Sequence, residues 1–277
     1  MMVEEARKKE LQEKIDKSKL VVREAFEKFD HKDLAITWTG GKDSTLTLWI
    51  IRQVCKEDGI DIPKVMTIDE GDAFPEIHSI LKEYEKKWDL DLVWCSNSDV
   101  IDAAGGVLGA DVEVAKLSEA NQKEIRERLD YPGDKFPFEA ESWIGNHLMK
   151  TVVFNDFLRR NNIKAMFMGI RWDEQEARTK DEYFVPRPGD EYTPSHTRIQ
   201  PILHFTERDI WDTTLTFDIP YCSLYENGYR SLGAATTSAK MSDIPAWEQD
   251  LENTVERAGR RQDKEEAMDR LRKLGYM

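Results

Sequence analysis

A glycine turn between two apolar segments constrains this chain more than any other feature. Residues 34–38 read LAITW, residues 39–44 read TGGKDS, and residues 46–55 have the apolar density of a buried helix. A strand, a tight glycine turn and a helix in that order are the opening of a parallel α/β sheet. Because glycine has no Cβ, such a turn can bend sharply and bring its backbone close to an anion.

The side chains of this turn suit a polyphosphate. The helix that follows begins with unpaired N–H groups and the positive end of its dipole. Thr39 and Ser44 add hydroxyl groups and Lys42 adds a positive charge, while Gly40 and Gly41 leave the backbone accessible. The glycine spacing is too short for the GxxxxGK[ST] loop of GTPases. The alternative is a glycine turn with a structural role only.

The same alternation continues along the chain. Apolar runs at 64–68, 91–95 and 164–168 predict strands, and helical spacing predicts helices at 4–29, 74–88, about 118–129 and 143–161. Short strands alternating with helices predict an α/β fold, a doubly wound, mostly parallel sheet with helices on both faces.

The second half of the chain is less periodic. Residues 181–195 are rich in proline and charge, which predicts a long loop over an active site. Residues 198–203 read as an edge strand because they contain Pro201. A helix with a capping box is predicted from Thr206, and residues 247–277 read as a charged helical extension. We therefore expect an N-terminal helix (1–30), a nucleotide-binding α/β domain (31–233) and a C-terminal helical tail (234–277).

Composition excludes several classes of protein. Acidic residues outnumber basic ones 54 to 40, giving a net charge of −14, which argues against general nucleic-acid binding. The three cysteines are far apart, so neither a disulfide framework nor a four-cysteine metal site is expected. The charged start of the sequence and the lack of a long apolar run predict no signal peptide and no membrane span. We expect a cytoplasmic protein.

The TGGKDS turn resembles the pyrophosphatase loop (SGGKDS) of the adenine-nucleotide alpha-hydrolase superfamily. The resemblance is to the group of phosphoadenylylsulfate (PAPS) reductases, sulfate adenylyltransferase small subunits and FAD synthetases. Similar segments follow in the same order, although Glu70 stands where threonine is usual and Phe205 where tryptophan is usual. They are 68–76 (IDEGDAFPE), 168–178 (MGIRWDEQEAR), 201–211 (PILHFTERDIW), 219–233 (IPYCSLYENGYRSLG), 256–263 (ERAGRRQD) and 273–277 (KLGYM).

The resemblance implies that the loop holds the phosphates of ATP or an adenylyl-sulfate, with chemistry at the α-phosphate or the attached sulfur. We assign Lys42 and the amides of Gly40 and Gly41 to the leaving phosphates. Arg171 would stabilise the transferred group. The predicted nucleotide-binding residues are Thr39, Gly40, Gly41, Ser44, Asp69 and Gly169.

Asp43 and Asp69 are predicted to organise Mg²⁺ around the phosphates, because carboxylates are the ligands that this ion prefers. Asp43 can equally cap the helix. Arg178, Arg230 and Tyr229 are predicted contacts of the substrate anion, since guanidinium groups suit phosphate or sulfate oxygens. Local ion pairs explain Arg178 about equally well, and a turn whose tyrosines pack on the core is the alternative for the segment that contains Tyr229 and Arg230.

The cysteine positions favour adenylyl transfer over reduction. The reductases that the chain resembles carry a cysteine in an ECGxH motif near the C-terminus, whereas here no cysteine follows Cys222. The first interpretation is sulfate attacking the α-phosphate of ATP, as in the sulfate adenylyltransferase small subunit, which acts beside a GTPase subunit. FMN adenylylation, a family member without the reductase cysteine, and a non-catalytic nucleotide-binding subunit are the alternatives. We expect ATP and a small anionic acceptor as partners, a GTPase subunit for the sulfate reaction, and a homo- or hetero-oligomer.

Overall fold

A six-stranded sheet with the strand order β3-β2-β1-β6-β8-β7 forms the centre of the molecule. The computed structural model describes residues 5–139, 142–174 and 178–259. Five strands run parallel and β7 runs antiparallel to β8, so the predicted mostly parallel sheet is confirmed. The strands are β1 (Leu34–Thr37), β2 (Lys64–Ile68), β3 (Leu92–Cys95), β6 (Ala165–Phe167), β7 (Phe184–Arg187) and β8 (His196–Ile199).

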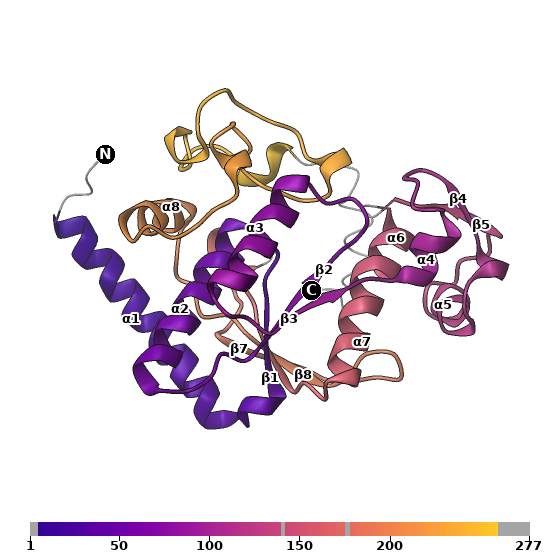
Figure 1. Cartoon of the computed structure of the whole chain (residues 1–277), viewed down its shortest axis with the longest axis horizontal. Helices are drawn as coiled ribbons and strands as arrows, with labels where there is room; N and C mark the ends of the chain where they lie inside the picture. The colour runs from indigo at the N-terminus through magenta and orange to yellow at the C-terminus, as the bar shows by residue number, and fades with distance from the viewer. Residues whose placement is uncertain (1–4, 140–141, 175–177, 260–277) are drawn as a thin grey trace.

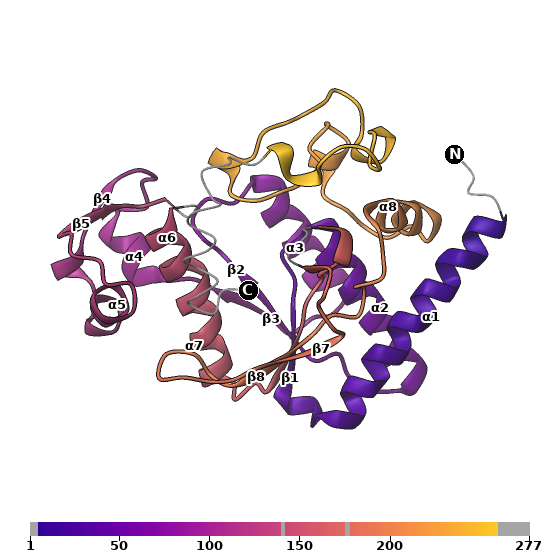
Figure 2. The same ribbon diagram turned by 180° about the vertical axis from the view of Figure 1, so that it is seen from behind.

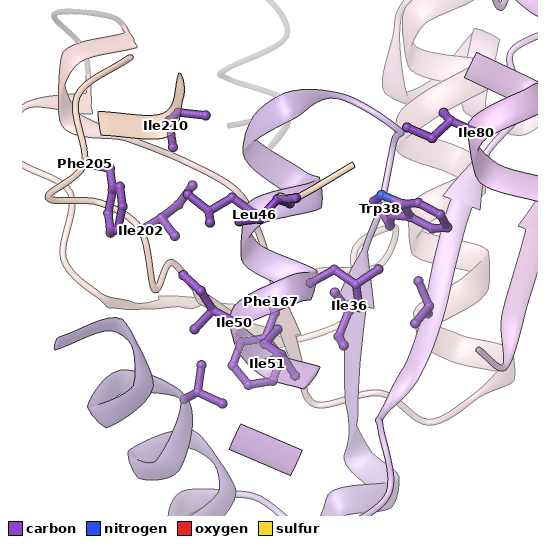
Figure 3. Close-up of a cluster of buried hydrophobic side chains, with 14 of the residues drawn as sticks. Ile36, Trp38, Leu46, Ile50, Ile51, Ile80, Phe167, Ile202, Phe205 and Ile210 are labelled. Atoms are coloured by element: carbon purple, nitrogen blue, oxygen red, sulfur yellow. The ribbon is translucent and has the colours of Figure 1, made fainter. Parts of the chain in front are cut away.

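Helices cover both faces of this sheet, as predicted (Figures 1 and 2). Alternate residues of β1 point to opposite faces: Ile36 belongs to the larger apolar cluster, and Ala35 packs with Phe157 on the other side. The larger cluster also holds side chains of α1 (Glu5–Lys28), α2 (Lys42–Asp58), α3 (Pro75–Lys87) and α8 (Glu207–Thr216), several of which Figure 3 draws. The opposite face is covered by α7 (Val153–Arg160).

The strand order reverses between β1 and β6. From β1 the chain moves outward through β2 to β3, then returns to place β6 on the other side of β1. In open parallel sheets, ligands bind beyond the carboxyl ends of the strands at such a reversal. The TGGKDS turn follows β1 and residues 168–171 follow β6, so both segments lie at this point.

A small lobe interrupts the alternation between β3 and α7. It contains α4 (Ser98–Ala103), α5 (Glu119–Lys123), α6 (Trp143–Asn146) and the antiparallel pair β4 (Asp111–Glu113) and β5 (Lys135–Pro137). Its apolar residues form a cluster of their own, which includes Phe136 and Leu148. Figure 1 shows this lobe on the opposite side of the molecule from α1. The sequence predicts helices at the positions of α5 and α6, but neither α4 nor the antiparallel pair β4 and β5.

The predicted loop at 181–195 is wrong for its first part, because β7 forms there. The strand predicted at 198–203 is not an edge strand. The observed strand β8 lies between β6 and β7 and ends before Pro201. The rule that proline marks an edge strand nevertheless holds, because Pro186 lies within β7. The described part of the predicted C-terminal extension contains short turns, at Ala246–Glu248 and Glu256–Gly259; residues 260–277 lie outside the described ranges.

One buried carboxylate joins the N-terminal helix to the rest of the fold. The side chain of Asp209 is 3% exposed and accepts hydrogen bonds from Arg7 (2.7 Å), Lys14 (2.5 Å) and the backbone N–H of Thr206 (2.7 Å). Burial would raise the pKa of Asp209, but hydrogen bonds from Lys14, Thr206 and Arg7 outweigh burial and lower the pKa. The predicted capping box of α8 is confirmed, with Asp209 as its acidic member.

We predict that Asp209→Asn lowers the free energy of unfolding at pH 7 by about 2 kcal/mol, since it removes a buried charge that pairs with Arg7 and Lys14 and that completes the capping box of α8. A lowered pKa in the folded state gives stability that is present above the unfolded pKa of about 3.9 and lost as the pH falls through the folded value. The deficit of the variant should therefore shrink below about pH 4. Urea unfolding at several pH values measures it. Asp212→Asn, at a side chain 24% exposed, is the control and should cost less than about 1 kcal/mol.

Candidate active site

The turn after β1 is braced by its own hydroxyl groups. The Ser44 hydroxyl accepts from the backbone N–H of Thr39 (3.2 Å) and donates to the carbonyl of Gly41 (3.0 Å). Gly40 has a φ of +74°, which a residue with a side chain rarely adopts, and its Cα faces Ile77 of α3 closely. The turn is therefore formed before any ligand arrives, as an anion-binding loop requires.

Lys42 is the first residue of α2 and is 3% exposed. Its Nζ lies 2.5 Å from a carboxylate oxygen of Glu256 and 3.8 Å from Glu207. Burial would lower the pKa of Lys42, but the charges of Asp43, Glu256 and Glu207 raise it above its usual value, so the amine is protonated. The backbone N–H of Lys42 donates to the hydroxyl of Tyr225 (3.1 Å).

Arg171 follows β6, on the other side of the reversal in strand order from Lys42, and the two side chains share Glu256 as a partner. Its guanidinium is completely buried and donates to Asp43, to Asp173 (2.8 Å) and to Glu256 (2.6 Å). Glu256 thus places one carboxylate oxygen on Lys42 and the other on Arg171. The structure brings together the two cations that the sequence assigns to the reacting phosphates.

Gly169 explains how the two loops come so close. A Cβ at this position would lie 2.7 Å from the carbonyl carbon of Asp43 and 2.7 Å from the backbone nitrogen of Ser44. The segment after β6 therefore packs directly on the first turn of α2. The predicted nucleotide-binding glycine has a packing role here, and this contact delivers Arg171 to Lys42.

Arg230 has partners other than the predicted substrate anion. It is 5% exposed, pairs with Glu207 at 2.7 Å and donates to the carbonyls of Leu251 (3.1 Å) and Thr254 (3.1 Å). These bonds hold the chain segment 250–256 against the start of α8. A positioning role for Arg230 accounts for all of these contacts.

The other two residues predicted to contact the substrate anion, Tyr229 and Arg178, contact residues other than Lys42 and Arg171. The ring of Tyr229 packs edge-on against Phe74, with centroids 5.4 Å apart, which supports the core-packing alternative. Arg178 pairs with Glu174, which also accepts from Arg257 at 3.1 Å.

The predicted metal ligands are engaged with protein groups. Asp43 pairs with Arg171, while Asp69 accepts from the backbone N–H of Gly71 (2.9 Å) and lies 3.5 Å from His78. Within residues 5–139, 142–174 and 178–259, no group of three or more His, Cys, Asp or Glu is arranged to hold a metal ion. Magnesium carried by a nucleotide needs only one or two carboxylates, so this donor set fits such an ion.

Three residues of the site were not predicted. Glu207, Tyr225 and Glu256 lie within the segments 201–211, 219–233 and 256–263 that carry the resemblance, but none of them is among the predicted site residues. Glu256 lies 214 residues from Lys42 along the chain, so no local pattern indicates their contact. Its place in a segment that resembles a known family was the available signal.

Comparison with known proteins identifies the family. The model of the phosphoadenosine phosphosulfate reductase domain matches residues 33–240, and the chain belongs to this family. A probable FAD synthase of Schizosaccharomyces pombe is 24% identical over 237 residues, covering 83% of this chain and 69% of that protein. The probable FAD synthase of Caenorhabditis elegans is 23% identical, and the chain spans 34% of its length. Sulfate adenylyltransferase subunit 2 of a Chelativorans strain is 28% identical over 142 residues, 43% of this chain and 44% of that protein.

A solved structure confirms the fold. The chain resembles the crystal structure of Candida glabrata FMN adenylyltransferase in complex with ATP, with a TM-score of 0.63 and 18% identity, over 92% of this chain and 89% of that one. The predicted class, a nucleotidyltransferase of the PAPS reductase-like family, agrees with these relatives. Among the described residues, no helix is long and apolar enough to cross a membrane.

We predict that Gly169→Ala lowers the free energy of unfolding by about 2 kcal/mol or more, because the added methyl group must displace backbone rather than a mobile side chain. Gly105→Ala is the control: nothing lies within 4 Å of its added Cβ, so only its positive φ opposes the change. Urea unfolding of both variants measures the difference. Equal losses in the two variants would contradict the close packing described here.

Proposed function

We propose that this protein transfers the adenylyl group of ATP to the phosphate of FMN, forming FAD and releasing pyrophosphate. The observation that carries the proposal is the Lys42–Arg171 pair, which one carboxylate bridges with its two oxygens at 2.5 and 2.6 Å. Two oxygens of a phosphate have a similar separation, and the pair lies at the strand reversal where nucleotides bind in such sheets.

The reaction needs no covalent intermediate on the protein. An ionised phosphate oxygen of FMN attacks the α-phosphorus of ATP, a new P–O bond forms, and the bond to pyrophosphate breaks. Lys42 and the turn amides would hold the leaving phosphates, and Arg171 would balance the charge that develops on the transferred group. Both cations are desolvated, so their interaction with a phosphate is stronger than it would be in water.

Magnesium, with Asp43 and Asp69 as its proposed ligands, would neutralise phosphate charge when bound. Both carboxylates follow strands whose carboxyl ends lie at the same edge of the sheet. Asp43 would have to exchange its contact with Arg171 for the ion.

Two findings support a flavin rather than sulfate as the acceptor. The FAD synthases match 82–83% of this chain, whereas the two sulfate adenylyltransferase subunits match 43% and 74% of it. The structural likeness to FMN adenylyltransferase extends over 92% of the chain. The first interpretation from the sequence, sulfate activation, therefore becomes the second candidate. It rests on these shorter matches and would imply a partner subunit to drive an unfavourable reaction.

The cysteines support adenylyl transfer over reduction. A reductase of this kind attacks sulfur with a thiolate. Burial raises the pKa of the Cys222 thiol to about 11 and that of Cys95 to about 11, so both are protonated near neutral pH. Cys55 is also buried, and burial raises its pKa to about 12.

The acceptor can be tested directly. Purified protein is incubated with Mg-ATP and either FMN, sulfate or no acceptor, and pyrophosphate and adenylylated products are measured. In the incubation with Mg-ATP and FMN, we expect pyrophosphate and FAD in equal amounts. We expect neither product with sulfate or without an acceptor. Pyrophosphate formed only with sulfate would establish the second candidate, and nucleotide binding without pyrophosphate release would indicate a non-catalytic subunit.

We predict that Lys42→Ala lowers kcat for pyrophosphate release at least 100-fold, because it removes a charge that stabilises the leaving group. Some loss of thermal stability should accompany it, since Glu256 and Glu207 lose a buried partner. Lys64→Ala, which removes a lysine paired with an exposed Asp91, is the matched control and should retain the wild-type rate. A folded Lys42→Ala protein with an unchanged kcat would refute the assigned role.

A further inference from the structure

The Glu256 carboxylate contacts both cations of the proposed phosphate site. Its two oxygens take one hydrogen bond each from Lys42 and Arg171, and its side chain is 9% exposed. It reaches this position from the C-terminal segment, which Figures 1 and 2 show lying across the edge of the molecule above α3. The site thus contains an internal anion supplied by a distant part of the chain.

We propose that Glu256 is an autoinhibitory carboxylate, which the phosphates of an incoming nucleotide or pyrophosphate must displace from Lys42 and Arg171. This inference rests on the proposed function, because it takes the two cations to be the phosphate site. Segment 252–256 withdraws as the ligand binds, so occupancy of the site and the position of the segment are coupled.

Electrostatics makes simultaneous occupancy unfavourable. A phosphate oxygen that accepts from Lys42 Nζ and Arg171 Nη2 takes the donors that the carboxylate now uses. If Glu256 stayed in place, two like charges would lie within a few ångströms of each other in a buried environment, where their repulsion is strong. Asp43 and Glu207 add further negative charge around Lys42. Exchange of one anion for another keeps the local charge balanced.

The segment is attached in a way that permits this movement. Leu251 is 8% exposed and packs in the main core, but Val255 is 73% exposed, so little apolar surface holds the end of the segment. Between them, Thr254 is held by hydrogen bonds from Arg230 to its hydroxyl and carbonyl oxygens. Hydrogen bonds and ion pairs, which another anion can replace, keep Glu256 in the site, rather than core packing. Residues 252–256 can therefore swing out while Leu251 stays buried.

The affinity for a phosphate ligand therefore depends on the equilibrium between two states of the segment, one with Glu256 on the cations and one with Glu256 away from them. The measured affinity equals the intrinsic affinity multiplied by the fraction of molecules whose Glu256 has left the cations. Any factor that fastens segment 250–256 to α8 would weaken phosphate binding, and any factor that releases the segment would strengthen it.

Calorimetric titration with inorganic pyrophosphate tests the inference. Glu256→Gln removes the charge but keeps the size of the side chain, and we expect it to bind pyrophosphate at least about tenfold more tightly than the wild type. Glu24→Gln is the matched control: Glu24 lies on α1, is 48% exposed and pairs with Lys28, so the affinity of this variant should be unchanged. Equal or weaker binding by Glu256→Gln overturns the inference.

Hydrogen exchange of the wild-type protein gives a second, independent readout. Saturating pyrophosphate should accelerate exchange of the backbone amides at 252–256, because the segment leaves its contacts. Unchanged or slower exchange there overturns the proposed displacement, whatever the stability of the Glu256 variant. If pyrophosphate binds and shifts exchange but FMN yields no FAD, the acceptor assignment fails and the inference stands. If pyrophosphate does not bind to either protein, both the inference and the phosphate site fail.

Discussion

The burial of Lys42 and Arg171 next to each other is the constraint on which the rest of the site depends. Two cations removed from water at a short distance repel each other, and each loses its hydration, so they need anions around them. The fold supplies Asp43 from α2, Glu207 from α8 and Glu256 from the C-terminal segment. Ion pairs at the carboxyl edge of the sheet therefore connect α2, α8 and the C-terminal segment, which lie far apart in the sequence.

The same constraint explains the small residues around the site. Arg171 reaches the start of α2 only because Gly169 lets the chain after β6 lie against the backbone of Asp43 and Ser44. The buried hydroxyl of Tyr225 then accepts from the first N–H of α2, which fixes the direction of that turn from the other side. Burial raises the pKa of Tyr225 to about 12, so it remains neutral beside Lys42.

Much of the fold could be predicted from the sequence because its signals are local. The run at 64–68 coincides with β2, and the TGGKDS turn predicts the strand and helix on either side of it. The pairing of β7 with β8 depends on contacts across a turn and has no strong apolar pattern, so Pro186 and its charged neighbours read as a loop. Lys42 and Arg171 were found from glycine motifs, whereas the partner that joins them, Glu256, is determined by tertiary packing and was missed.

A site that already holds an anion selects among the anions that can replace it. Breaking the contacts of Glu256 with both cations is costly, because it exposes two desolvated charges at once. A ligand with one small charged group replaces those contacts but gains little beyond them. A nucleotide can replace them and also place its other phosphates against the glycine turn at the start of α2. The internal carboxylate therefore favours polyphosphates over single oxyanions, which agrees with ATP as the proposed substrate.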